Sequence, residues 1–172
     1  MLEEAAGELF LEQGFAATSV ADITQRAGVS RSSFFNYFGG KSDLLWAGFD
    51  ELVERLCAEM TADPSDPRTA LLRLADDLPA DHVALAFTQS DAMGLGDDLR
   101  LAAARRTVDV ADALMPAGAG LHPLHARVAA TAWAGALIAA VQEWARTGAA
   151  RSRLTEHLAA ALGPVAEAFE AP

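Results

Sequence analysis

Residues 18–41 read TSVADITQRAGVSRSSFFNYFGGK, and this stretch predicts two short helices joined by a tight turn. Ser19 can cap the first helix, with Asp22 three residues later as its partner in a capping box. Gly28 can adopt the left-handed conformation with which a chain leaves a helix. Ser30 can then cap the second helix. The two caps and the glycine therefore predict where both helices begin and where the first one ends.

The second of these helices has a polar first turn and an apolar side. Arg31 opens the first turn and two serines follow it, whereas Phe34 and Phe38 lie four residues apart and can face inward together. A helix with hydrogen-bonding side chains on its first turn, supported by a preceding helix, can place them against base edges in the major groove of DNA. Residues 19–38 are therefore predicted to form a helix-turn-helix.

The remaining sequence predicts further helices and has no alternating strand pattern. Leu2, Leu9 and Phe10 belong to the apolar stripe of a first helix, which Gly14 closes. Further helices are expected over residues 42–60, 67–78, 80–90, 98–114, 122–147 and 152–169. The predicted fold is all-α with about nine helices.

Composition limits the class of protein. Apolar residues make up 52% of the 172 residues, which is enough for a sizeable core. No uninterrupted apolar run reaches the roughly 18 residues of a membrane span. Cys57 is the single cysteine, so no intrachain disulfide can form, and this suits a reducing cytoplasm. Because Cys57 follows Val53 and Leu56 on the same predicted helix, we expect its thiol to be buried.

Four ordered segments resemble the TetR family of one-component repressors. They are GFAATSV at 14–20, AGVSR at 27–31, FFNYF at 34–38 and KSDLL at 41–45. The resemblance implies a DNA-binding domain over residues 1–46 and a helical regulatory and dimerisation domain over residues 47–172. It implies a cytoplasmic repressor, released from a palindromic double-stranded DNA operator when a small, mostly apolar effector binds the second domain.

The resemblance also implies which residues contact DNA. Arg31, Ser32 and Ser33 would read bases, because arginine can bind guanine with two hydrogen bonds. Thr18, Tyr37 and Lys41 would position the protein on phosphates, which carry no sequence information directly. Ser30 and Phe35 complete the predicted DNA-binding set. Phe35 stands where the family usually has tyrosine, so one phosphate-binding hydroxyl is missing. Gly39 stands where a proline is common, which makes the connection to the next helix looser.

The charge balance does not favour DNA binding. The net charge is −11, and residues 1–49 contain three cations against six carboxylates. A nucleic-acid binder usually has a basic patch, because neutralising phosphates supplies much of its affinity. The three cations nevertheless belong to the helix-turn-helix side, whereas four of the six carboxylates belong to the first helix.

The regulatory half contains large apolar residues and a few polar ones that could line an effector pocket. The predicted ligand-binding residues are Phe87, Gln89, Met93, Met115, Thr131, Trp133, Gln142 and Trp144. Plain core packing is the alternative interpretation of each. A homodimer is expected through residues 122–147 and 152–169, where small residues such as Gly135 would let another helix approach closely. The alternative is that both helices serve only this chain's own core.

Other functions find less support in the sequence. No nucleophile–base pair, metal cluster or paired carboxylates of a catalytic kind can be named, so neither enzymatic activity nor a cofactor is predicted. His122 and His125 are expected to be surface or capping residues rather than metal ligands. Two alternatives stay open: a helical interaction module that no longer binds DNA, and a small helical enzyme.

Overall fold

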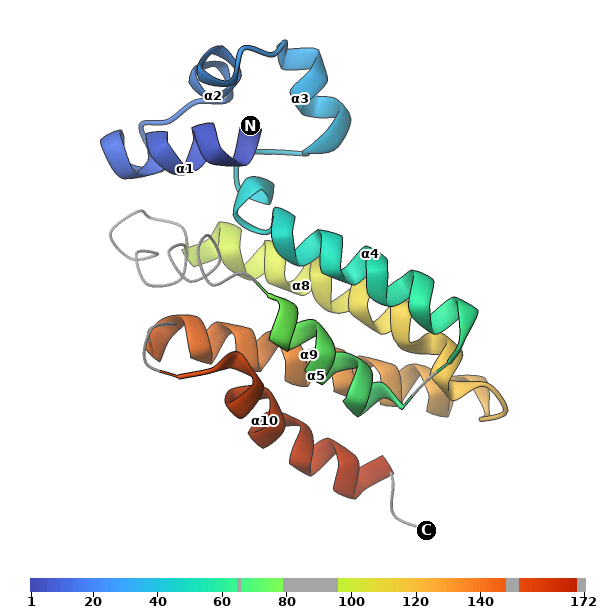
Figure 1. Ribbon diagram of the computed structural model, residues 1–172. Coiled ribbons are helices and arrows are strands. Elements are labelled where there is room, and N and C mark those ends of the chain that lie inside the picture. Colours follow the sequence, from blue (N-terminus) through green and yellow to red (C-terminus); the bar gives the residue numbers. More distant parts are fainter. Residues whose placement is uncertain (65, 79–95, 148–151, 170–172) are drawn as a thin grey trace.

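The structure is a computed structural model that describes residues 1–64, 66–78, 96–147 and 152–169 (Figure 1). These residues form eight α-helices and two short 3-10 helices, with no strand among them, which confirms the all-α prediction. The elements in chain order are α1 (Leu2–Gln13), α2 (Val20–Ala27), α3 (Arg31–Tyr37), η1 (Asp43–Leu45), α4 (Ala47–Ala62), α5 (Pro67–Asp77), α8 (Gly96–Leu114), η2 (Met115–Gly118), α9 (Pro123–Thr147) and α10 (Leu154–Phe169).

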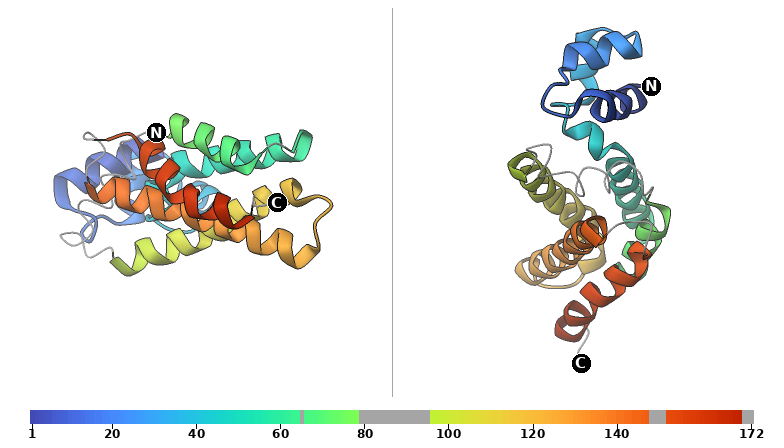
Figure 2. Two further views of the ribbon diagram at one scale, coloured as in Figure 1. Left: turned by 90° about the horizontal axis from the view of Figure 1, so that it is seen from below. Right: turned by 90° about the vertical axis from the view of Figure 1, so that its left-hand side faces the viewer.

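The first three helices form a small headpiece at one end of the molecule, and the other helices form a larger body (Figures 1 and 2). The short helix η1 connects α3 to α4, which runs along α8 in the body. This arrangement leaves α2 and α3 at the end of the molecule that is farthest from α10.

Aromatic side chains hold the headpiece together. Phe10 and Phe15 are buried with their ring centroids 5.0 Å apart, which anchors the chain that follows α1. Ile23 of α2 and Phe34 of α3 are fully buried, so the two helices of the helix-turn-helix share one core. Because burying such a side chain contributes roughly 1.5–3 kcal/mol, these anchors fix the orientation of α3.

The long helix α9 is the centre of the body. It packs against α8 on one side and α10 on another. By length and composition alone α9 could cross a membrane, but in this fold Trp133, Leu137, Val141 and Trp144 are buried in the core. Its apolar character is therefore accounted for by packing among the neighbouring helices.

The structure corrects two expectations and does not test a third. The helix expected from residue 42 begins only at Ala47, because η1 precedes it, and Ser42 makes no side-chain capping bond. Cys57 is exposed rather than buried, because the buried face of α4 contains Val53 and Leu56 and a helix turns about 100° between adjacent residues. The helix expected at 80–90 lies outside the described residues.

Candidate nucleic-acid interface

The helix-turn-helix is built from the local contacts that its sequence predicts. The Ser19 hydroxyl accepts a hydrogen bond from the Asp22 backbone N–H at 3.1 Å, and the Asp22 carboxylate accepts one from the Ser19 N–H at 2.8 Å. The Ser19 hydroxyl also donates to the Asp22 carboxylate at 2.6 Å, and this bond, together with the one from the Ser19 N–H, holds the pKa of Asp22 below its usual value. Gly28 ends α2 in the left-handed conformation, with φ 68°. The predicted capping box and glycine exit are therefore confirmed.

The helix α3 is capped in the predicted way and presents a polar first turn. The Ser30 hydroxyl accepts a hydrogen bond from the Ser33 N–H at 3.0 Å. It also lies 2.8 Å from the hydroxyl oxygens of Ser32 and Ser33, so both of these hydroxyl groups are hydrogen-bonded to Ser30. Phe34 points into the core from the other side of α3. One side of α3 is thus anchored and the opposite side is exposed.

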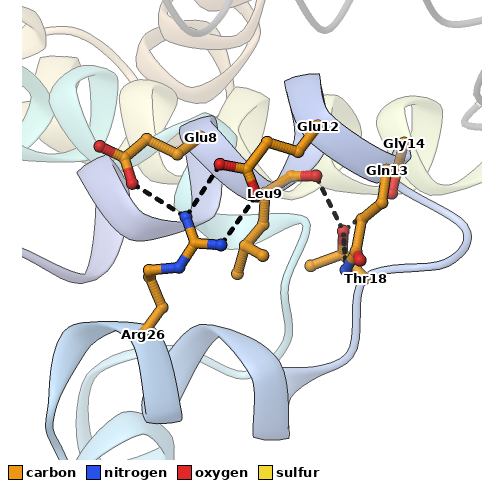
Figure 3. A network of polar contacts seen from close by, with 7 residues as sticks. All are labelled: Glu8, Leu9, Glu12, Gln13, Gly14, Thr18 and Arg26. Atoms are coloured by element: carbon orange, nitrogen blue, oxygen red, sulfur yellow. Dashed lines mark hydrogen bonds and ion pairs between the residues drawn. The ribbon is translucent and has the colours of Figure 1, made fainter.

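Two of the three cations in the headpiece have internal partners. Arg26 of α2 bridges two carboxylates of α1: its Nη1 lies 3.1 Å from Glu8 and its Nη2 lies 2.8 Å from Glu12 (Figure 3). Hydrogen bonding to Arg26 lowers the pKa of Glu12, and the bonds to Glu12 and Glu8 raise the pKa of Arg26. Much of the acidic charge on α1 is therefore paired within the headpiece.

Lys41 is the second cation with internal partners. Its Nζ donates hydrogen bonds to the carbonyl oxygens of Phe15 at 2.6 Å and Thr18 at 2.9 Å. The ammonium also lies 4.1 Å from the centroid of the Phe15 ring. Lys41 therefore ties the chain after α3 to the loop between α1 and α2, a structural task that the sequence did not indicate.

Thr18 also has hydrogen-bond partners within the headpiece. Its side chain is buried, and its hydroxyl donates to the carbonyl oxygen of Gly14 at 2.8 Å, with that of Leu9 at 3.3 Å (Figure 3). The Gln13 side-chain amide lies 3.3 Å from the same hydroxyl. Thr18 closes the loop between α1 and α2, and a phosphate contact by its hydroxyl stays a prediction.

Arg31 differs from the other two cations of the headpiece. It is exposed on the first turn of α3 and makes no ion pair or hydrogen bond with any residue that the structure describes. On the same helix Phe35 is 54% exposed and Tyr37 is 81% exposed. The structure thus brings Ser30, Arg31, Ser32, Ser33, Phe35 and Tyr37 together on one short helix.

A buried arginine of α8 forms an ion pair with α4 and approaches η1, which leads to the headpiece. Arg106 of α8 is 4% exposed and donates to the Asp50 carboxylate of α4 through Nε at 2.7 Å and Nη2 at 2.5 Å. Its guanidinium also lies 3.8 Å from the Asp43 carboxylate and 4.8 Å from the Trp46 ring. Burial raises the pKa of the Asp50 carboxyl, and the bonds from Arg106 only partly offset that rise.

Asp43 extends this ion pair toward the end of α3. Its carboxylate accepts hydrogen bonds from the backbone N–H groups of Gly39 at 2.9 Å and Gly40 at 3.2 Å. The chain directly after α3 is therefore joined to α8 through one carboxylate. Sequence reasoning missed Arg106, because its partners come from a different part of the chain.

The predicted effector-binding residues do not share one cavity in the part of the chain that the structure describes. Trp133 lines an apolar cavity of about 160 Å³ together with Leu114 and Ala130, whereas Trp144 lines a separate hollow beside Leu154. The other positions differ in burial or lie outside the described part: Met115 and Gln142 are half-buried, Thr131 is exposed, and Phe87, Gln89 and Met93 lie outside the described residues.

Neighbouring polar residues of the body have structural partners. The Trp144 indole N–H donates to the Ser152 carbonyl oxygen at 3.0 Å, and the Thr131 hydroxyl donates to the Arg127 carbonyl oxygen at 2.8 Å. The Leu124 backbone N–H donates to His122 Nδ1 at 3.3 Å, which confirms His122 as a capping residue at the start of α9. No group of three potential metal ligands occurs among the described residues.

Comparison with known proteins places these features in a family. Residues 2–47 match the family model for bacterial regulatory proteins of the tetR family. The HTH-type transcriptional repressor Rv3405c of Mycobacterium tuberculosis is 43% identical over 53 residues, which are 31% of this chain and 28% of the relative. The HTH-type transcriptional regulator TtgR of Pseudomonas putida is 35% identical over 86 residues, 45% of this chain and 41% of the relative. The chain thus matches less than half the length of these curated relatives.

Solved structures share the whole fold. The crystal structure of Thermus thermophilus FadR, a TetR-family transcriptional repressor in complex with lauroyl-CoA, has a TM-score of 0.61 and 23% identity, covering 99% of this chain and 94% of that one. The dihydroxyacetone kinase operon activator DhaS has a TM-score of 0.55 and 17% identity, covering 98% and 94%. At this identity the likeness shows the fold alone. The N-terminal helices therefore belong to the tetR family of bacterial regulatory proteins, and the whole chain has the fold of solved TetR-family regulators.

Proposed function

We propose that this protein is a ligand-responsive repressor that binds a palindromic operator and leaves it when a small, mostly apolar effector binds the body. The observation that carries the proposal is Arg31, which is exposed on the first turn of an anchored helix and has no partner among the described residues. A guanidinium in this position can donate two hydrogen bonds to guanine in the major groove. Arg26 and Lys41 hold the headpiece together, which leaves Arg31 available for DNA.

The proposal requires two headpieces, because one short recognition helix reads only a few base pairs. We place the dimer contact on α9 and α10, the segments 122–147 and 152–169. A Cβ atom added at Gly135 or at Gly163 would meet no atom within 4 Å, so both helices have open space beside a glycine. A second copy of the chain could fill that space, with the recognition helices about 34–36 Å apart to match successive major grooves.

The path from effector to DNA would pass through Arg106. An effector acts only by binding one of two protein states more tightly than the other. Asp43 touches both the chain after α3 and the guanidinium of Arg106, so a movement of α8 would be felt at the end of the recognition helix. This connection supports a regulator more than an interaction module whose DNA-binding motif is vestigial.

The apolar class of effector is supported by the lining of the cavity beside Trp133. Leu114, Ala130 and Trp133 contribute apolar surface there, and its volume of about 160 Å³ would hold only part of a typical ligand. Because the solved Thermus repressor of this fold is in complex with lauroyl-CoA, we would use lauric acid, which matches the apolar acyl chain of that molecule, as the first probe, followed by other fatty acids and small aromatic compounds.

The test begins with a gel shift of the purified protein on the DNA upstream of its own gene. We expect selective binding, and Arg31→Ala should lose the preference over random DNA, because one good base contact provides about 1–3 kcal/mol of discrimination. Arg73→Ala removes an exposed cation of α5 and is the matched control. Equal preference in Arg31→Ala and wild type, or no binding to any DNA, would refute the proposal and favour the interaction module.

A further inference from the structure

We propose that Phe35 is a specificity-determining residue that selects operators with a thymine methyl group opposite α3. The inference rests on the proposed DNA binding and adds to it the chemistry of the preferred sequence. Phe34 of α3 is fully buried and Phe38, directly after α3, is half-buried, whereas Phe35 exposes 54% of its surface. An aromatic ring is therefore presented to the surroundings on the helix that carries Arg31.

The orientation of the Phe35 ring is set by its neighbour. The rings of Phe34 and Phe35 meet edge to face, with centroids 5.2 Å apart and an interplanar angle of 83°. Since Phe34 is fixed in the core, this contact restrains the exposed ring before any partner binds. Phe35 also lies one helical turn after Arg31, so both side chains occupy the same face of α3.

The chemistry of that face leaves few groups that can discriminate bases. The hydroxyl groups of Ser32 and Ser33 are both hydrogen-bonded to that of Ser30. Arg31 is suited to guanine, but a phenyl ring can neither donate nor accept a conventional hydrogen bond. The apolar group that the major groove presents is the C5-methyl of thymine. A phenylalanine on this face consequently favours thymine, whereas a tyrosine could instead donate to a phosphate.

The spacing along α3 predicts where the two contacts fall. Arg31 and Phe35 are four residues apart, which corresponds to about 6 Å along the helix axis. Base pairs are separated by about 3.4 Å, so the guanine and the methyl group should lie within about two base pairs of each other. Each half-site would therefore combine one guanine with a nearby thymine.

The experiment uses the operator fragment that the wild-type protein binds, with single thymines replaced by deoxyuridine. This replacement deletes one methyl group and leaves the hydrogen-bonding pattern of the base unchanged. Replacing the contacted thymine in one half-site should weaken binding about fourfold, because the complex then buries one methyl group fewer. Substitution in both half-sites should multiply the loss to about 16-fold. Uridine at positions outside the half-sites should have no effect.

Variants then assign the effect to Phe35. Phe35→Ala should bind thymine and uracil operators equally, whereas Phe35→Leu should keep a preference for thymine because it keeps an apolar side chain. Asn36→Ala, which changes the exposed neighbour, should retain the full thymine preference. Circular dichroism and thermal melting of each variant would establish that the headpiece is folded.

The outcomes separate this inference from the proposed function. Wild-type binding that is unaffected by uracil at every half-site position would overturn the role of Phe35 and leave DNA binding intact. A uracil effect that persists undiminished in Phe35→Ala would assign the methyl contact to another residue and overturn the inference as well. Failure of the wild type to bind any DNA would instead overturn the proposed function.

Discussion

Replacing Arg106 by methionine should destabilise the protein by about 2–3 kcal/mol. Methionine keeps much of the length and apolar contact of the arginine stem but removes the charge and the donors. The change breaks both hydrogen bonds to Asp50 and the bond from Nη1 to the Ala102 carbonyl oxygen at 3.2 Å. It also leaves the carboxylates of Asp43 and Asp50 close together without the cation between them.

The magnitude follows from the different exposure of the two partners. Removing one member of a fully buried ion pair typically costs 3–5 kcal/mol, because the other charge stays buried without a partner. The Arg106 side chain is 5% exposed, but the Asp50 side chain is 42% exposed and can recover part of its hydration. The expected loss is therefore at or below the lower end of that range, about 2–3 kcal/mol, which corresponds to a decrease in Tm of roughly 5–10 °C for a chain of this length.

The assay is reversible thermal or urea unfolding, followed by circular dichroism at 222 nm or so, since the fold is helical. Arg105→Met is the matched control, because Arg105 is the exposed neighbour on α8 and surface substitutions usually change stability by less than about 0.5 kcal/mol. A loss below about 1 kcal/mol for Arg106→Met, or a loss equal to that of Arg105→Met, would refute the claim that this ion pair joins α4 to α8.

Three other perturbations have defined outcomes. Lys41→Met should lower headpiece stability by about 1–2 kcal/mol, because two carbonyl oxygens lose a charged donor, and should weaken binding to all DNA; unchanged melting would contradict this contact. Gly135→Leu should dissociate the dimer, as measured by light scattering. The chain should stay folded, because the added side chain meets open space within a single chain. Ala58→Leu on α4 is the control and should remain dimeric. Burial raises the pKa of folded Asp50 above its unfolded value of about 3.9, so the folded state binds this proton first as the pH falls. The stability of wild type relative to Asp50→Asn should therefore increase as the pH is lowered toward about 4, and a flat difference would contradict the shift.

The features that the sequence predicted well are local ones. The Ser19–Asp22 capping box and the Ser30 cap join residues three apart, and Gly28 supplies the left-handed exit. Contacts of this kind depend on the chain within one helical turn, so they can be recognised before the tertiary structure is known. The start of α4 was harder to predict, because Asp43 binds the backbone of Gly39 and Gly40 in a 3-10 turn.

Burial and the assembly of a cavity were predicted less well. Cys57 proved exposed although apolar residues precede it on α4, because it lies on a side of the helix that does not pack against the body. Trp133 and Trp144 are both in the core, as large apolar residues should be, but they line different hollows. Whether side chains converge depends on how helices cross, and hydrophobic periodicity does not contain that information.

The sequence by itself determined the helical class, the helix-turn-helix and the residues that α3 could offer to DNA. Only the tertiary structure decided which cations are available. Arg26 is neutralised by α1, Lys41 binds carbonyl oxygens 23 and 26 residues away, and Arg106 pairs with Asp50 across 56 residues. A formal charge can be counted along a chain, but its effect on DNA depends on the distance to its partners and on its exposure to water, and both are set when the helices pack.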